Sequence, residues 1–551
     1  MISIRVLNTG ETIAVPREST VQQVIEHIQY QNPCKPLAAR VNNRIRELDS
    51  KIHMDAQLEL IDIRDPDGMR MVQRGLVFLL YIAAKELFPD RQLKVLHSIN
   101  NALYCELGDW VSDEEIQKLH QRMEALIHQD LPFQKEKMDK LIATKKFMEQ
   151  GDTDKVSLFR YRKKSTISIY RCGAVPFINY FYGYMVPSTS YLSPFELRTY
   201  AQGFLMIHPT AASPRQLPEY QELPKFSQVF LQYQRWGEVL EIDTVADLNE
   251  KIAQEKIKEI IWISEALHEK KIALMAEEIC NHPGKRLILI AGPSSSGKTS
   301  TSKRLELHLK ANGRKPITIA LDDYFVDREK TPLDEEGNYN FESIDALDLD
   351  LFNDHLIRLM NGELVMIPTF NFRLGKRIEE SKTLQASPNQ PIIVEGIHGL
   401  NEKLTRKIPR KKKFKIYVSA LTQLSIDYCN RIPTTDTRLL RRIVRDHKFR
   451  GHSALRTIQM WPSVRRGEEQ YIFPFQEEAD VMFSSALSYE LSVIRNFAEP
   501  LLVQINESQR ENTEAKRLLK FLEYFLPITD YEDIPRNSIL REFIGGSVLD
   551  L

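Results

Sequence analysis

The sequence has few cysteines, no net charge and no long hydrophobic run. Its 551 residues include five cysteines that form no CxxC pair, which argues against a zinc knuckle or a redox motif. Basic and acidic residues number 75 each, so no strong overall field attracts nucleic acid or anionic lipid. The longest apolar run, 76–84, is too short to span a bilayer, and the residues after Met1 lack the layout of a signal peptide. We therefore expect reduced thiols, no membrane contact and a cytoplasmic location.

What the sequence does contain is a composition of 42% hydrophobic and 27% charged residues, which is typical of a globular protein. At about 150 residues per domain, the length predicts three or four domains. Residues 1–63 combine strand-like alternation, two hairpin turns and a capping box at Thr20 and Gln23. The resulting order, ββαβββ, predicts a small β-grasp domain.

Residues 66–223 mix helix and strand patterns and predict an α+β domain. Helical spacing occurs at 75–88 and 112–129, and a strand-like run follows at 166–173. A proline-rich stretch then precedes further helices, so we expect a helical connector over 224–284. A last domain follows it, and residues 506–551 are expected to form a C-terminal helical tail.

A family likeness is carried by the strings LLYIAAKELFP and YRCGAVPFINYFYGYMVPSTSYL. Residues 1–63 resemble the TGS domain, and residues 66–223 resemble the editing domain, of threonyl-tRNA synthetases. Where that editing domain has His and Cys ligands for zinc, this chain has Phe78, Ile82, Phe181 and Met185. Because zinc needs imidazole, thiolate or carboxylate donors, the resemblance implies the fold without the metal chemistry. The synthetase catalytic core has no counterpart in the sequence.

A phosphate-binding loop follows the apolar run 286–290. The segment GPSSSGKT, residues 292–299, has the GxxxxGK[ST] pattern between a strand-like run and a helical run. Its glycines let backbone N–H groups face phosphates, Lys298 reaches the β and γ oxygens, and Thr299 can hold Mg²⁺. We therefore expect ATP and Mg²⁺ as cofactors, bound by Gly292, Ser294, Ser295, Ser296, Gly297, Lys298, Thr299 and Ser300.

Carboxylates and arginines suited to phosphoryl transfer follow along the chain. Asp322 and Asp323 end one apolar strand and Glu395 ends another, and such strand ends face the ligand crevice of an open α/β sheet. One carboxylate can accept a proton from an attacking hydroxyl, and another can orient Mg²⁺. Arginines recur at helical spacing over 435–451, and guanidinium groups stabilise the charge of a transferring phosphoryl group.

Together these strings resemble the uridine kinase and phosphoribulokinase family over residues 285–505. The P-loop, LDDYF, NFESIDALD, IPTFNF, VEGIHGL, DTRLLRRIVRD and EADVMF occur in the family's order. The resemblance implies that Asp322 is the general base and that Glu395 lies near the metal, which Thr299 also holds. It adds Lys298, Arg442 and Arg445 to the catalytic residues and places Arg450 at the ATP site.

The acceptor site departs from the family pattern. Uridine-cytidine kinases have an Asp for the ribose hydroxyls where this chain has Glu342, and a Tyr and a His for the pyrimidine where it has Phe370 and Gly375. Arg377 is retained nearby. We expect substrate contacts from Asp322, Glu342, Phe370 and Arg377, with intact transfer chemistry and altered base recognition.

The sequence thus predicts a multidomain α/β protein that ends in a P-loop kinase with a parallel sheet flanked by helices. The expected reaction is transfer of the γ-phosphoryl group of ATP to a nucleoside 5′-hydroxyl, with uridine and cytidine as the first candidates. Two alternatives stay open: a phosphoribulokinase-like kinase of a sugar or sugar phosphate, and a tRNA-binding regulatory protein with a nucleotide switch. A nucleoside is the expected substrate partner, tRNA or another regulatory ligand is a candidate for the N-terminal domains, and a homo-oligomer stays open.

Overall fold

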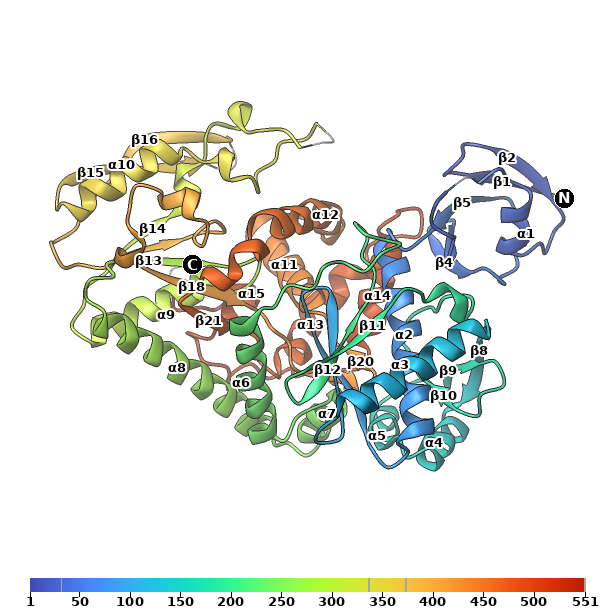
Figure 1. The fold of residues 1–551 in the computed structure, drawn as a ribbon. Coiled ribbons are helices and arrows are strands. Elements are labelled where there is room, and N and C mark those ends of the chain that lie inside the picture. The colour runs from blue at the N-terminus through green and yellow to red at the C-terminus, as the bar shows by residue number, and fades with distance from the viewer. Residues whose placement is uncertain (31, 335–336, 372–373, 550–551) are drawn as a thin grey trace.

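A computed structural model describes residues 1–30, 32–334, 337–371 and 374–549 of the chain. Figure 1 shows a small N-terminal sheet at one end, and a larger body in which the remaining parts pack together. Phe372, which belongs to one of the strings that carry the kinase likeness, lies outside the described residues, as do the last two residues of the expected C-terminal tail.

The N-terminal part has the predicted order ββαβββ. Its five-stranded sheet has the order β2-β1-β5-β3-β4. Thr20 and Gln23 form the expected capping box at the start of its helix. Asn42 and Asn43 both have positive φ, as a tight hairpin turn requires. The elements are β1 (Ile2–Val6), β2 (Thr12–Val15), α1 (Val21–Glu26), β3 (Ala38–Val41), β4 (Arg44–Glu47) and β5 (Ala56–Ile61).

The middle part contains two antiparallel sheets and four helices. Its first helix begins at Pro66, earlier than the spacing from 75 predicts, because Asp65 caps it and proline is favoured at the first helical position. The sheets have the orders β10-β9-β8 and β11-β12-β7-β6. The elements are α2 (Pro66–Leu87), β6 (Leu93–Ile99), β7 (Ala102–Leu107), α3 (Asp113–His128), β8 (Phe133–Asp139), α4 (Lys140–Glu149), α5 (Thr153–Arg160), β9 (Thr166–Cys172), β10 (Ile178–Asn179), β11 (Glu196–Tyr200) and β12 (Gly203–Ile207).

The four positions that the resemblance matches to zinc ligands form part of an apolar cluster. Phe78, Ile82, Phe181 and Met185 are each at most 2% exposed and belong to one hydrophobic core. The rings of Phe78 and Phe181 lie 5.7 Å apart. These four side chains therefore stabilise the middle part by packing.

Three helices connect the middle part to the parallel sheet of the predicted kinase domain. They are α6 (Pro224–Leu240), α7 (Val245–Ala253) and α8 (Ile257–Asn281). Helix α6 begins inside the proline-rich stretch, again with proline in its first turn. Helix α8 runs along the lower edge of the sheet in Figure 1 and packs against the helix that follows the P-loop.

Five parallel strands form the sheet of the predicted kinase domain, in the order β14-β17-β13-β18-β21. Strands β13 and β18 are buried along their whole length, as expected for a parallel sheet with both faces covered. The strands are β13 (Leu287–Ala291), β14 (Ile317–Ala320), β17 (Ile392–Glu395), β18 (Lys413–Ser419) and β21 (Val481–Ser484).

The rest of this part of the chain consists of helices and two small strand pairs. The antiparallel pair β15 (Leu364–Asn371) and β16 (Lys376–Gln385) projects with α10 (Leu349–Met360) at one end of the molecule (Figure 1). The other elements are α9 (Lys298–Ala311), β19 (Ser425–Asp427), β20 (Asn430–Arg431), α11 (Thr434–Arg450), α12 (Ala454–Tyr471), α13 (Glu490–Leu502), α14 (Asn512–Leu522) and α15 (Arg541–Ile544).

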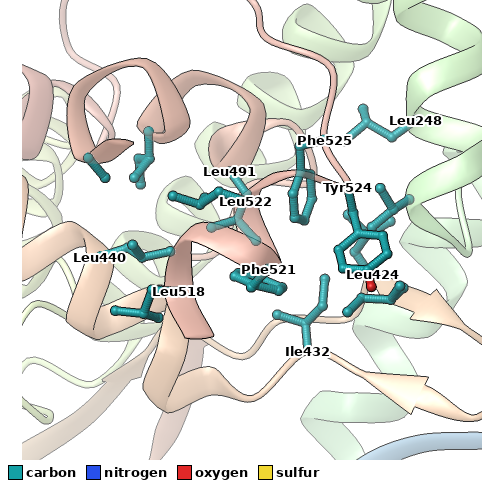
Figure 2. Close-up of a cluster of buried hydrophobic side chains, with 14 of the residues drawn as sticks. Leu248, Leu424, Ile432, Leu440, Leu491, Leu518, Phe521, Leu522, Tyr524 and Phe525 are labelled. Atoms are coloured by element: carbon teal, nitrogen blue, oxygen red, sulfur yellow. The ribbon is translucent and has the colours of Figure 1, made fainter. Parts of the chain in front are cut away.

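The largest hydrophobic core is shared by residues from four predicted parts of the chain. Figure 2 shows Leu248 of the connector, Leu440 and Leu491 of the kinase-like part, and Leu518 and Phe521 of the tail around one cluster. The same core includes Phe147 and Tyr180 of the middle part. The connector and tail are therefore packed elements of the fold.

No helix within the described ranges has the length and apolar character needed to cross a bilayer.

Candidate functional site

The P-loop joins the end of β13 to the start of α9. Gly292 has no room for a side chain, because a Cβ there would lie 1.9 Å from the carbonyl oxygen of Val418. Gly297 has φ +82°, a left-handed conformation that glycine adopts without strain. Both glycines of the GxxxxGK[ST] pattern are therefore required by the backbone path.

Side chains from other elements donate hydrogen bonds to carbonyl groups of the P-loop. Arg438 of α11 donates from Nη1 to the carbonyl oxygen of Ser294 at 3.1 Å, and the hydroxyl of Ser485 donates to that of Ser296. In a trans peptide the carbonyl and the following N–H point in opposite directions. The N–H of Gly297 therefore points away from Ser485. It directly precedes the first-turn amides of α9, which have no acceptor within the helix.

Lys298, Thr299 and Glu395 meet at the carboxyl edge of the sheet. The Lys298 Nζ donates to the carbonyl of Pro293 at 3.3 Å, and the Thr299 hydroxyl donates to a Glu395 carboxylate oxygen at 3.4 Å. Glu395 stands beside Ala320 in the sheet register, and Asp322 follows Ala320 by two residues. Residues that lie far apart in the sequence are thus brought to one edge.

The pKa values of the two acids reflect this crowded edge. Burial raises the pKa of Glu395 to about 7, against the lowering effect of Lys298, and the Asp322 charge raises it further. Asp322 is exposed to solvent at this edge, yet enough protein lies around its carboxyl group that desolvation raises its pKa; Lys298, Arg450 and Arg445 oppose that rise. Both acids therefore respond to the charge of the P-loop lysine, and Glu395 also responds to the charge of Asp322.

The arginines of α11 separate into two groups. The predicted catalytic arginines, Arg442 and Arg445, and the cofactor-site Arg450 all pair with Asp446, at 3.2, 3.2 and 3.5 Å. Arg442 also donates to the hydroxyl of the P-loop Ser294 at 2.7 Å. These three guanidinium groups are thus gathered by one carboxylate beside the P-loop.

The other two arginines of the helix have structural partners. Arg438 donates to Glu468 at 2.8 Å, and Arg441 pairs with the buried Glu490. Helical spacing suggests that Arg438 and Arg441 belong with the phosphate-facing set, but the tertiary structure uses both to hold the P-loop backbone. The Ser295 carbonyl accepts a bond from Arg441 at 3.3 Å.

Glu342, which is predicted to contact the acceptor, lies against helix α12. A Cβ at Gly467 would lie 2.3 Å from the Cβ of Glu342, so the two backbones approach closely. Burial raises the pKa of Glu342 to about 7, while the charge of Arg442 lowers it and that of Glu468 raises it. Its carboxyl group therefore lies within electrostatic reach of Arg442, which contacts the P-loop.

The remaining predicted substrate residues have structural contacts of their own. The ring of Phe370 is 7% exposed and packs 5.6 Å from that of Phe325, within a hydrophobic core. Arg377 pairs with Asp348 at 3.0 Å. The guanidinium of Arg328 lies over Gly375, 2.7 Å from where a Cβ would stand. Contacts of Phe370 and Arg377 with a substrate stay a prediction.

Thr299 and Glu395 suit a magnesium ion. Mg²⁺ keeps several water ligands and is bound by one or two carboxylates together with substrate phosphates, and this pair offers one hydroxyl and one carboxylate. Within the part of the chain that the structure describes, no cluster of three or more His, Cys, Asp or Glu side chains could hold a metal by itself. A metal at this edge would therefore need oxygen ligands from water and nucleotide.

Sequence reasoning missed the acids that organise the site. Asp446 is i+4 from Arg442 and i−4 from Arg450, a spacing that could have identified it. Glu468 accepts from the Ser294 amide at 3.1 Å, and Glu542 accepts from the Ser300 amide at 3.2 Å. Nothing in the local sequence signals these two long-range contacts.

A parallel sheet whose first strand leads into a P-loop, with acids at the ends of two neighbouring strands, is the architecture of a P-loop nucleotide-binding domain. The family model that matches this chain is that of the Phosphoribulokinase / Uridine kinase family, over residues 287–491. A uridine kinase of Staphylococcus aureus (strain JH9) is 32% identical over 208 residues, which are 38% of this chain and 91% of that protein. The chain belongs to the phosphoribulokinase and uridine kinase family.

The N-terminal region matches a different class of protein. A threonine–tRNA ligase of Halorhodospira halophila is 29% identical over 201 residues, which are 36% of this chain and 31% of the ligase. This chain thus spans about a third of the length of that relative. Among solved structures, "a Possible Uridine Kinase from Bacillus stearothermophilus" is 19% identical, with 39% of this chain and 98% of that chain covered and a TM-score of 0.27.

Proposed function

We propose that the protein is an ATP- and Mg²⁺-dependent kinase that phosphorylates the 5′-hydroxyl of a nucleoside, with uridine and cytidine as the leading acceptors. The observation that carries the proposal is the meeting of Lys298, Thr299, Asp322 and Glu395 at one sheet edge. Family membership supports a nucleoside or sugar kinase. The choice of a nucleoside rests on the retained motifs and on Glu342.

The residues of the chain have distinct roles in this reaction. Asp322 accepts the proton of the acceptor hydroxyl. The oxygen of that hydroxyl forms a bond to the γ-phosphorus, while the bond between the γ-phosphorus and the β-phosphate oxygen breaks. ADP leaves with the bonding electron pair. Lys298 and the arginines of α11 stabilise the charge on the transferring group. Thr299 and Glu395 would hold Mg²⁺, which would neutralise phosphate charge when bound.

The acceptor site is expected to discriminate weakly between bases. Neither Phe370 nor Gly375 offers a side-chain hydrogen bond to a pyrimidine edge, and strong rejection of a wrong base needs buried polar groups that would be left unpaired. We therefore expect kcat/KM for uridine and cytidine to lie within about tenfold of each other, a difference of ~1.4 kcal/mol.

Steady-state kinetics with ATP and uridine, cytidine, inosine or ribulose 5-phosphate test the proposal. A preference of about a thousandfold for uridine would contradict weak base discrimination. Turnover of ribulose 5-phosphate alone would favour a sugar-phosphate kinase. Salt-dependent tRNA binding without turnover of any acceptor would favour the regulatory alternative, which the similarity to threonine–tRNA ligase supports.

A further inference from the structure

The C-terminal segment 538–546 packs directly on the P-loop. Ile539 lies behind Gly297, where a Cβ would come within 2.6 Å of its Cγ2 atom. The ring of Phe543 lies 4.9 Å from the guanidinium carbon of Arg441, and Lys448 donates to the carbonyl of Ile544. Helix α15, which contains Phe543, lies beside α11 near the sheet in Figure 1. The end of the chain is thus part of the wall of the nucleotide site.

Glu542 of this segment binds the start of helix α9. One of its carboxylate oxygens accepts from the amide of Ser300 at 3.2 Å and from the Ser300 hydroxyl at 2.7 Å. The residue is 9% exposed, and across the described ranges no Lys, Arg or His forms an ion pair with it. Its negative charge also raises the pKa of Glu395. A buried carboxylate therefore stands at the positive end of α9, close to the acids of the site.

The Ser300 amide belongs to the group of N–H donors that a P-loop uses for phosphate. The third residue of a helix has no acceptor within that helix, and the first-turn amides after a P-loop bind the phosphates of a nucleotide. A carboxylate and a phosphate oxygen cannot both accept from one N–H, and two anions at one helix terminus repel each other. Glu542 and the nucleotide therefore compete for one position.

We propose that the C-terminal segment is an autoinhibitory element in which Glu542 occupies a phosphate position of the nucleotide site and must withdraw before the nucleotide is fully bound. This inference rests on the proposed nucleotide-dependent function. It also assigns a role to the end of the chain, to which the family motifs do not extend. The segment lowers nucleotide affinity in the resting protein and is released when nucleotide binds.

The first test is calorimetric titration of the full chain with ATP, ADP and AMP in the presence of Mg²⁺. In Glu542→Gln the oxygen that accepts from Ser300 is kept and the negative charge is removed. We expect the Kd for ATP to fall by at least about fivefold, the lower end of typical coupling between sites. Glu532→Gln makes the same change at an exposed position of the tail and should leave the Kd unchanged.

An unchanged or higher Kd in Glu542→Gln would overturn the inference and leave the proposed kinase function standing. Absence of ATP binding in both the wild-type chain and the variant would overturn both. A second test uses the wild-type chain alone, so it does not depend on the folding of a variant. Saturating ATP should increase hydrogen exchange at residues 538–546, and unchanged or increased protection there would contradict displacement of the segment.

Discussion

Asp322 carries the proton-accepting role in the proposed reaction, and Asp322→Asn removes that role with little change of shape. We expect kcat to fall by roughly 10² to 10⁴, the range for a positioned general base, while ATP binding stays nearly intact. Steady-state kinetics with calorimetric ATP titration measures both quantities. Asp354→Asn is the matched control, because Asp354 lies on α10 with a side chain that is 58% exposed. Unchanged turnover in Asp322→Asn would remove Asp322 from the role of base.

Glu342 gives the fold a pH dependence of defined sign. Burial raises its pKa from 4.5 to about 7. Well below pH 4.5 the carboxyl group is neutral in both the folded and the unfolded chain. As the pH rises toward 7, the unfolded chain ionises first, so this group's contribution to the free energy of unfolding decreases.

Glu342→Gln cannot ionise and should therefore gain stability relative to the wild-type protein as the pH rises from 4.5 to about 7, by at most ~1.4 kcal/mol per pH unit, with no further gain above that range. Urea denaturation across this range measures the difference. Glu363→Gln, at a side chain that is 50% exposed, should give a curve parallel to that of the wild type. A difference between Glu342→Gln and the wild type that does not change with pH would show that burial does not control this carboxyl.

Helix α11 presents three of its arginines as a set because Asp446 holds them together. Asp446 is fully buried and pairs with Arg442, Arg445 and Arg450. Without its charge, three guanidinium groups repel one another beside the P-loop. Asp446 is thus a positioning residue for groups that face the phosphates.

Asp446→Asn should lower kcat by at least about tenfold, less than the 10² to 10³ typical of deleting a stabilising donor outright. It should also lower the melting temperature, since loss of one partner leaves buried charges unpaired. His447→Gln, at the exposed neighbouring position, should change neither quantity. A lower melting temperature with unchanged kcat would mean that Asp446 stabilises the helix without positioning its arginines.

The middle part is expected to bind no zinc at the four apolar positions on α2 and after β10. Phe78, Ile82, Phe181 and Met185 offer no imidazole, thiolate or carboxylate donor. Protein purified without added metal should therefore contain far less than one zinc ion per chain by elemental mass spectrometry. Stoichiometric zinc that is lost when residues 66–223 are removed would contradict this expectation.

The sequence predicted helix starts, turns and loops well where they depend on neighbouring residues. The capping box at Thr20, the Asn42–Asn43 turn and the P-loop each depend on residues within a few positions, and all occur as expected. The start of α2 was predicted too late, because hydrophobic spacing marks the buried face and gives no weight to the cap at Asp65. The division of roles among the α11 arginines could not be predicted, since their partners lie elsewhere in the chain.

Outside the N-terminal sheet, the molecule is held together by a core that crosses the predicted domain boundaries. Phe147 of the middle part, Leu248 of the connector and Phe521 of the tail pack in the same cluster as Leu440 and Leu491. A fragment of residues 285–505 would therefore expose apolar surface that is buried in the full chain. Each fully buried aliphatic or aromatic side chain contributes about 1.5–3 kcal/mol.

We expect the 285–505 fragment to melt at least about 10 °C below the full chain, since 1 kcal/mol corresponds to roughly 2–4 °C for a domain of this size. Differential scanning calorimetry of the two proteins makes the comparison. A fragment that includes residues 224–549 restores the connector and tail and should recover part of the difference. A 285–505 fragment that melts as cooperatively, and at the same temperature, as the full chain would show that the shared core is not needed.

The sequence by itself determined the phosphate-binding loop, the parallel-sheet kinase fold and the acids at the strand ends, because motif spacing and strand periodicity are local properties. Only the tertiary structure decided which charges meet. Ser300 and Glu542 are 242 residues apart, and Arg438 reaches Glu468 across 30 residues. Such contacts depend on how whole elements pack, and in particular on the shared core that brings the C-terminal segment back to the P-loop. No local pattern encodes that return, so the roles of Glu468 and Glu542 emerged only from the fold.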